Sequence, residues 1–286
     1  MNHQYKGSLH IHTTISDGRK DPKDTLEAYK LAGYDFVALT DHWSYGEASE
    51  YKGMQVLSGI EYDTGHSVVD GIFHIVGIGM ERKPSLERSD LSSYSNSVER
   101  AQHIINCIND AGGAAILAHP AWSINRASDI LKLHGLAGVE VYNAVSGYPF
   151  GNRANSAVIL DTLAADGYFL PVHAADDTHF WEGEECSSFV LTTERNFIHA
   201  IKSGNLYASR GPRMEITRDG NTLHIECSPA SSIIIQTGSV WINGRILTGD
   251  GITSRDYTIE PNDLFARAEV IDKNGNTAWS GYYKYA

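Results

Sequence analysis

The 286-residue chain has few cysteines and no apolar run long enough to span a membrane. Its three cysteines, Cys107, Cys186 and Cys227, are far apart and form no CxxC pair. An odd, sparse set of this kind indicates reduced thiols. Residues 1–8 are polar and do not resemble a signal peptide. We therefore expect a cytoplasmic protein that has no membrane partner.

Basic residues are also scarce. The chain has 23 Lys and Arg residues against 35 Asp and Glu residues, a formal net charge of -12. Proteins that bind extended nucleic acid normally carry a basic stripe, so we expect no such binding. A small anionic substrate stays compatible with this charge, because bound metal ions can reverse the sign of the field locally. No Ser, Cys or Lys stands in a nucleophile motif, which disfavours a covalent intermediate.

What the chain does have is a regular alternation of strand and helix patterns over its first two-thirds. Apolar strand patterns alternate with amphipathic helix patterns, which is typical of an α/β protein with a parallel sheet. Asp21 and Pro22 predict the start of the first helix and Gly33 its end. Strands are predicted at 7–11, 36–39, 56–60, 73–78, 114–118, 138–142, 168–173 and 188–192, and further helices at 98–108, 154–165 and 194–203. Seven or eight such strands predict a closed or distorted (β/α) barrel, whose active site lies at the loops after the strands.

The pattern changes after Gly211 and Pro212. Short strands separated by turn residues are predicted at 214–217, 223–227, 232–236, 240–242, 257–259 and 265–271. We therefore divide the chain into a barrel domain, residues 1–210, and a small β-sandwich-like domain, residues 211–286. The second domain has one histidine, His224, and is expected to serve packing or interaction.

Side chains that can bind metal ions gather at the predicted strand ends. His10 and His12 alternate along a strand end, so both rings can point to the same side of the sheet. Asp177 and His179 have the same spacing after a later strand. The full set is His10, His12, Asp17, His42, Glu61, His74, His119, Asp177 and His179.

Taken singly, any of these histidines is more often a packing or surface residue than a ligand. Six histidines and three carboxylates at successive strand ends are hard to obtain by accident. They are too many for one ion and suit two or three divalent ions that share a bridging carboxylate. Mixed imidazole and carboxylate ligands suit Zn, Mn and Fe alike. Asp41 is expected to orient its neighbours by hydrogen bonds, and His173 to lie in the core.

In their order along the chain, these motifs resemble those of the PHP (polymerase and histidinol phosphatase) family. The similarity covers roughly residues 7–210 and is carried by HIHTTISDG at 10–18, TDH at 40–42, GIE at 59–61, HP at 119–120 and DTH at 177–179. The resemblance implies a distorted (β/α)7 barrel with a trinuclear metal centre. It also implies three ligand sets: His10, His12, Glu61 and Asp177; Glu61, His74 and His119; and Asp17, His42 and His179.

Two further similarities concern branches of the family. Some members carry histidine where Asp17 stands, and aspartate there resembles the branch of nucleotide phosphatases and exonuclease-like enzymes. The β-rich tail and the segments 119–122 (HPAW) and 139–143 (VEVYN) are similar to carbaryl-type carbamate and ester hydrolases.

These observations predict a metal-dependent hydrolase, in the first place a phosphoesterase acting on a nucleotide or sugar phosphate. Two ions bridged by Glu61 would lower the pKa of a shared water and supply hydroxide as the nucleophile. Besides Glu61 and Asp177, Arg19 and Arg210 are candidate catalytic residues that could contact a phosphate. A carbamate or carboxylic ester hydrolase and a non-catalytic metal-binding module remain alternatives. The pattern leaves the substrate, the metal and the oligomeric state open.

Overall fold

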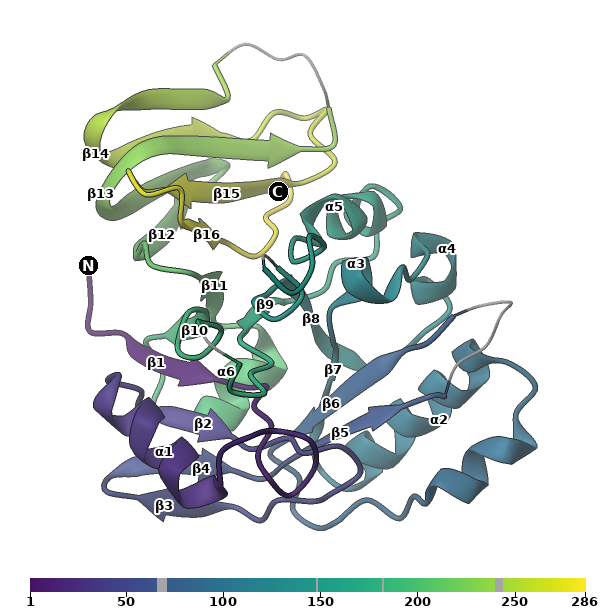
Figure 1. Ribbon diagram of the computed structural model, residues 1–286. Coiled ribbons are helices and arrows are strands. Elements are labelled where there is room, and N and C mark those ends of the chain that lie inside the picture. The colour runs from purple at the N-terminus through teal and green to yellow at the C-terminus, as the bar shows by residue number, and fades with distance from the viewer. Residues whose placement is uncertain (66–70, 148, 182, 240–243) are drawn as a thin grey trace.

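A computed structural model describes residues 1–65, 71–147, 149–181, 183–239 and 244–286 as two β-sheets with helices on their outer faces (Figure 1). This confirms a mixed α/β fold. No helix of the described ranges has the length and apolar character needed to cross a membrane.

The five-stranded sheet has the order β5-β6-β7-β8-β9. Its strands are β5 (Gly59–Asp63), β6 (His74–Ile78), β7 (Ala114–Leu117), β8 (Leu136–Asn143) and β9 (Val172–Ala175). Strands β7, β8 and β9 are parallel, but β6 runs antiparallel to both of its neighbours. The prediction of a parallel sheet is therefore wrong for β6, and also for the predicted strand 188–192, which runs antiparallel to the first strand of the chain in the other sheet. For β6 the physical reason is the link between β5 and β6, which is too short to hold the crossover helix that parallel strands need.

Helices cover the outer face of this sheet and form the largest core with it. They are α2 (Ser97–Asp110), α4 (Ala127–Ile130) and α5 (Ala157–Ala165), with the short α3 (Pro120–Ser123) and η1 (Arg88–Ser93) nearby. The apolar stripe of α2, including Ile104, Ile105 and Ile108, is fully buried against the sheet.

The second sheet contains the remaining strands of the N-terminal part. Its order includes β11-β10-β1-β2-β4-β3, with bounds β1 (Tyr5–Ser8), β2 (Phe36–Ala38), β3 (Ser49–Tyr51), β4 (Met54–Leu57), β10 (Phe189–Thr192) and β11 (Tyr207–Ser209). Helix α1 (Pro22–Leu31) begins as predicted, because the Asp21 side chain accepts hydrogen bonds from the backbone N–H groups of Lys23 and Asp24. Helix α6 (Phe197–Ser203) follows β10.

The two sheets do not close into one hydrogen-bonded barrel among the residues that the structure describes. Two isolated parallel bridges, Ile11 with Thr178 and His42 with Glu61, link them where strands end, and an antiparallel bridge joins Gly46 to Gly59 at the start of β5. The predicted strand 56–60 is in fact divided: β4 belongs to one sheet and β5 to the other. The predicted (β/α)7 barrel is thus not confirmed. The parallel bridges nevertheless bring the strand ends of both sheets to one rim.

The C-terminal part is antiparallel and has its own apolar core. It consists of β12 (Met214–Asp219), β13 (Thr222–Thr237), β14 (Ile246–Thr258), β15 (Ala266–Ile271) and β16 (Thr277–Trp279). Two predicted strands, 223–227 and 232–236, are one long strand, β13. The predicted strand 240–242 lies outside the described residues. Strand β16 pairs with β11, so this sheet continues the one below it (Figure 1). The domain division at residue 210 and the sandwich form stay predictions.

Candidate metal centre

Glu61 stands at the centre of the rim, on β5, with its side chain 1% exposed. Five imidazole nitrogens surround its two oxygens. His42 Nδ1 and His74 Nδ1 are each 2.9 Å away. The others are Nε2 of His12 at 3.2 Å, of His10 at 3.3 Å and of His119 at 3.6 Å. One carboxylate therefore faces five nitrogen donors from four different segments, since His10 and His12 share one.

Asp177 supplies a second buried carboxylate on the loop after β9. Its Oδ1 lies 3.0 Å from His12 Nε2 and 3.2 Å from His10 Nε2, and those two nitrogens are 3.2 Å apart. Ligand atoms that bind one ion at about 2.1 Å lie roughly 3 to 3.5 Å from one another. The spacing of this group therefore fits a shared cation.

Asp17 forms a third, more open group. Its carboxylate lies 3.4 Å from His179 Nε2 and 3.7 Å from both His12 Nδ1 and His42 Nε2. The Asp17 side chain is 56% exposed, whereas Glu61 and Asp177 are buried. The rim is thus closed at Glu61 and open to solvent at Asp17.

All nine residues singled out in the sequence lie together. Three groups have ligand atoms within 4.8 Å of one another: His10, His12, Glu61 and Asp177; His42, Glu61 and His74; and His12, Asp17, His42 and His179. The first matches the set implied by the family resemblance. The other two differ in detail, because His42 joins His74 at Glu61 and His12 reaches the Asp17 group. His119 stays near Glu61 and Asp177 without joining a compact group.

The buried histidines and carboxylates of the site shift one another's pKa values. Burial alone would lower the pKa of His12, but hydrogen bonds and charge from Asp177 and Glu61 outweigh it and raise that pKa to about 9. Burial alone would raise the pKa of Glu61, but the charges of His10 and His74 hold it well below its usual range. Positive charge is therefore favoured next to Glu61 and Asp177, and a divalent cation supplies it as protons do.

Glu140 also contacts the site, although the sequence motifs did not single it out. It lies on β8, is buried, and its Oε1 is 2.7 Å from His10 Nδ1. Its Oε2 accepts hydrogen bonds from the His119 backbone N–H and the Asn143 side-chain amide, each at 2.9 Å. The Asn143 amide also donates to Asp177 Oδ2 at 3.1 Å. This network orients His10 so that Nε2 faces Glu61 and Asp177.

Asp41 orders the loop that carries Asp17. It accepts hydrogen bonds from the backbone N–H and the hydroxyl of both Thr13 and Ser16, at 2.7 to 3.1 Å. It therefore has the orienting role expected for it, although the groups that it holds belong to the loop rather than to His42.

The backbone is strained at two of the nine residues. His119 has φ 29° and Asp177 has φ 52°, values that non-glycine residues adopt at a cost of about 1–3 kcal/mol. Both residues follow the end of a strand and point a side chain at Glu61 or at His10. Strain of this kind persists where the surrounding structure fixes the residue, as it does at functional sites.

The two arginine candidates lie differently. The exposed Arg19 places its guanidinium 3.1 Å from the centre of the Trp181 ring, and its backbone N–H bonds the carbonyl oxygen of His179. Arg210 places its guanidinium 4.5 Å from the centre of the Tyr142 ring, and its backbone N–H bonds Thr277. Within the described ranges, neither guanidinium forms an ion pair with a carboxylate of the nine residues, so the catalytic roles of the two arginines stay predictions.

The fold of this chain is similar to that of a solved structure. A two-domain protein of Bacteroides vulgatus, containing a predicted PHP-like metal-dependent phosphoesterase, superposes with a TM-score of 0.51 at 14% identity. The match covers 98% of this chain and 95% of that one. This chain has the PHP-like fold. The shared coverage includes the C-terminal β part.

Two curated proteins match parts of the sequence. An uncharacterized protein of Methanocaldococcus jannaschii is 29% identical over 151 residues, which cover 49% of this chain and 82% of that protein. The DNA polymerase/3'-5' exonuclease PolX of Bacillus subtilis is 30% identical over 80 residues, 21% of this chain but 14% of the polymerase. No family model matches the chain. The similarity to carbaryl-type hydrolases is not confirmed by these matches.

Proposed function

We propose that the protein is a metal-dependent phosphoesterase that hydrolyses a small phosphorylated molecule. The observation that carries this proposal is the placement of Glu61, one buried carboxylate facing five imidazole nitrogens, with Asp177 beside it. A structural metal site is closed, whereas a catalytic one keeps an open position. The exposed Asp17 group supplies that opening, which argues against a purely structural role.

The residues that would hold two to three divalent ions, whether Zn, Mn or Fe, are the nine of the rim. Such ions, when bound, activate water and neutralise developing negative charge on the substrate. The chain's own groups do the positioning. Glu140 fixes the orientation of the His10 ring, and Asp41 fixes the loop of Asp17.

The charge balance of the site favours an anionic substrate. Three dications carry six positive charges, and Asp17, Glu61 and Asp177 offset three of them. The buried Glu140 next to His10 offsets about one more. About two positive charges are left to attract an incoming phosphate. An uncharged ester would be attracted less strongly by this net positive charge.

Exposed aromatic side chains around the rim support a substrate that carries a flat ring. Trp122 is 45% exposed, and its ring centre lies 5.0 Å from that of His119 and 6.1 Å from that of His74. On the segment after His179, Trp181 is 44% exposed and lies 6.3 Å from the 43% exposed Phe150. Large rings left in water near a site commonly contact a ligand. They favour a nucleotide over a sugar phosphate within the proposed class.

The direct test compares p-nitrophenyl phosphate, bis-(p-nitrophenyl) phosphate, p-nitrophenyl acetate and a p-nitrophenyl carbamate on metal-loaded and chelator-treated protein. We expect the phosphate esters to be cleaved, the chelator to abolish turnover, and added metal to restore it. Preferred cleavage of the acetate or the carbamate would replace the proposal with the ester-hydrolase alternative. Full turnover without metal would defeat both.

A further inference from the structure

Strand β8 has a local irregularity beside the metal centre. Glu140 pairs with His173 of β9 and Tyr142 pairs with Ala174, the next residue of β9, so Val141 is an extra residue in β8. An extra residue of this kind is a β-bulge, which changes the side of the sheet to which the following side chains point. Bulges are frequent next to active sites, where they re-aim a side chain.

The bulge places Glu140 and Asn143 on the same side of the sheet. In a regular strand, side chains three positions apart would point to opposite sides. The Asn143 amide donates to Glu140 Oε2 at 2.9 Å and to Asp177 Oδ2 at 3.1 Å, and its oxygen accepts from the backbone N–H and the hydroxyl of Ser146. The bulge therefore allows Asn143 to hold Asp177 in the metal centre.

The same bulge turns Tyr142 to the other side of the sheet, where it meets the C-terminal part. Tyr142 packs against the largest apolar core, to which Val141 and Trp279 also belong. Trp279, on β16, is 2% exposed, and its ring is stacked on that of Tyr142, with 5.6 Å between the ring centres and 20° between the planes. In a regular strand Tyr142 would point to the same side as Glu140. The stack on Trp279 and the bulge in β8 therefore depend on each other.

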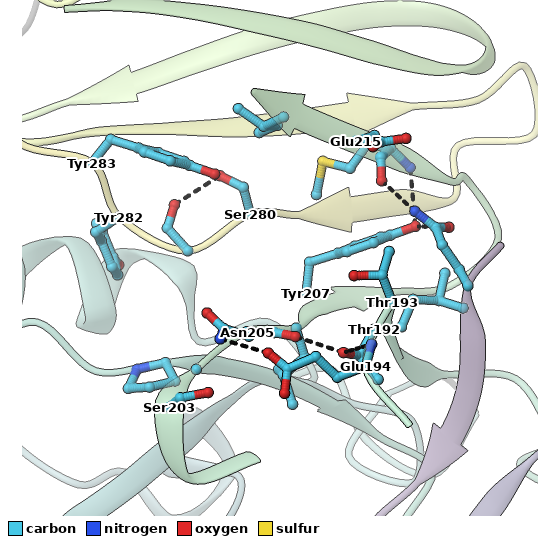
Figure 2. A pocket seen from close by; sticks show the side chains of 18 of the residues that line it. Thr192, Thr193, Glu194, Ser203, Asn205, Tyr207, Glu215, Ser280, Tyr282 and Tyr283 are labelled. Carbon is cyan, nitrogen blue, oxygen red and sulfur yellow. Dashed lines mark hydrogen bonds between the residues drawn. The ribbon is translucent and has the colours of Figure 1, made fainter. Parts of the chain in front are cut away.

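Trp279 lies where the two parts of the fold join. Strand β16 pairs with β11, and a cavity of about 620 Å³ lies beside this pair. Figure 2 shows Tyr207 of β11 on one side of the cavity and Ser280, the residue after Trp279, on the other. Because this space is not filled by side chains, the position of β16 over β8 depends on direct contacts such as the stack of Trp279 on Tyr142.

We propose that Trp279 is a positioning residue of the metal centre. By stacking on Tyr142 it holds the bulge of β8, and the bulge in turn holds the Asn143 amide that orients Asp177. The C-terminal β part thereby takes part in metal binding. The inference rests on the metal binding that the proposed function requires, but not on the substrate.

The test is a competition titration of zinc against a chromophoric chelator, with the full chain. Trp279→Leu and Tyr142→Leu each remove the stack and should weaken zinc binding by about tenfold, the lower end of the range for groups that orient metal ligands. Trp279→Phe and Tyr142→Phe keep an aromatic ring and should stay within about twofold of the wild type. Two leucine variants at different positions keep the test valid if one of them does not fold.

Asp161→Ala is the matched control for a loosened join. Asp161, on α5, accepts two hydrogen bonds from Arg267 on β15, so this variant weakens another link between the two parts and leaves the Tyr142 stack in place. Its zinc affinity should stay within about twofold of the wild type. In the metal-free chain, amide exchange at residues 143–145 should be faster in Trp279→Leu than in Asp161→Ala.

A double variant tests the route through Asn143. If Trp279 acts through the Asn143 amide, Asn143→Ala combined with Trp279→Leu should bind zinc about as weakly as Asn143→Ala alone. Effects of the two substitutions that simply multiply would overturn the proposal.

Two further results would overturn it. One is zinc affinity within about twofold of the wild type in both leucine variants. The other is an equal loss of affinity in Asp161→Ala, because general loosening of the join would then explain the effect. In both cases the wild type still binds zinc, whereas a wild type that binds no zinc would overturn the proposed function as well.

Discussion

Replacing Glu140 by Gln tests whether the hydrogen-bond network behind His10 sets the metal affinity. Glu140 is 2% exposed and faces three groups: His10 Nδ1, the His119 backbone N–H and the Asn143 amide. A carboxylate can accept from all three, but glutamine has only one acceptor oxygen. In either orientation its NH2 group must face a donor.

The magnitude follows from this mismatch. A buried donor left without an acceptor costs about 1–3 kcal/mol. Loss of a group that orients a metal-binding histidine typically costs 10- to 100-fold in metal affinity. We therefore expect Glu140→Gln to lower the free energy of unfolding by about 1–3 kcal/mol and to weaken metal binding by about 10- to 100-fold.

The assay is a competition titration of zinc against a chromophoric chelator, with chemical unfolding of the same samples. Glu27→Gln is the matched control, because Glu27 also accepts side-chain hydrogen bonds, from Tyr51 and Lys52, but lies on α1. Wild-type zinc affinity in Glu140→Gln would refute the reasoning, since the network would then not position His10.

Three further predictions concern other parts of the chain. Burial lowers the pKa of His173 to about 4. Between about pH 6.5 and pH 4 the unfolded chain therefore binds a proton at His173 that the folded chain does not bind, and stability falls as the pH falls. Between pH 7 and pH 4.5 the wild type should therefore lose about 2–3 kcal/mol more unfolding free energy than His173→Leu, and equal losses would contradict this. The buried Arg267 makes two 2.6 Å hydrogen bonds to Asp161 and one to Glu269, which would still balance its charge in Asp161→Ala. That variant should therefore cost about 1.5–3 kcal/mol in thermal or chemical unfolding, and a cost under about 0.5 kcal/mol would contradict this. Asp41→Ala should loosen the loop of Asp17, seen as faster amide exchange at residues 13–17, whereas unchanged exchange would remove the orienting role of Asp41.

Much of the site could be predicted from the sequence because the ends of apolar strands can be recognised from the pattern of residues. The alternation of His10 and His12, and of Asp177 and His179, requires only the two-residue period of extended chain. His74 was also placed at the start of its strand. The structure supplies the reason for its position: β6 runs antiparallel, so its start lies at the same rim as the ends of β5 and β7.

What the sequence could not provide depends on contacts between distant segments. Glu140 lies in an apolar strand, and its partners His10 and His119 are 130 and 21 positions away. A signal was available, since a lone carboxylate inside a buried strand requires partners. The division of the strand pattern 56–60 between two sheets was likewise hidden, because apolar periodicity does not show which neighbour a strand pairs with.

We propose that the nine side chains bind adjacent divalent ions at one rim of the fold. The most direct measurement is the number of ions bound per chain after equilibrium dialysis against zinc or manganese, for the wild type and for Glu61→Gln. The account predicts two to three ions for the wild type and a loss of at least one in the variant, because Glu61 faces five of the six imidazoles. One ion or none in the wild type, or equal numbers in both proteins, would contradict it.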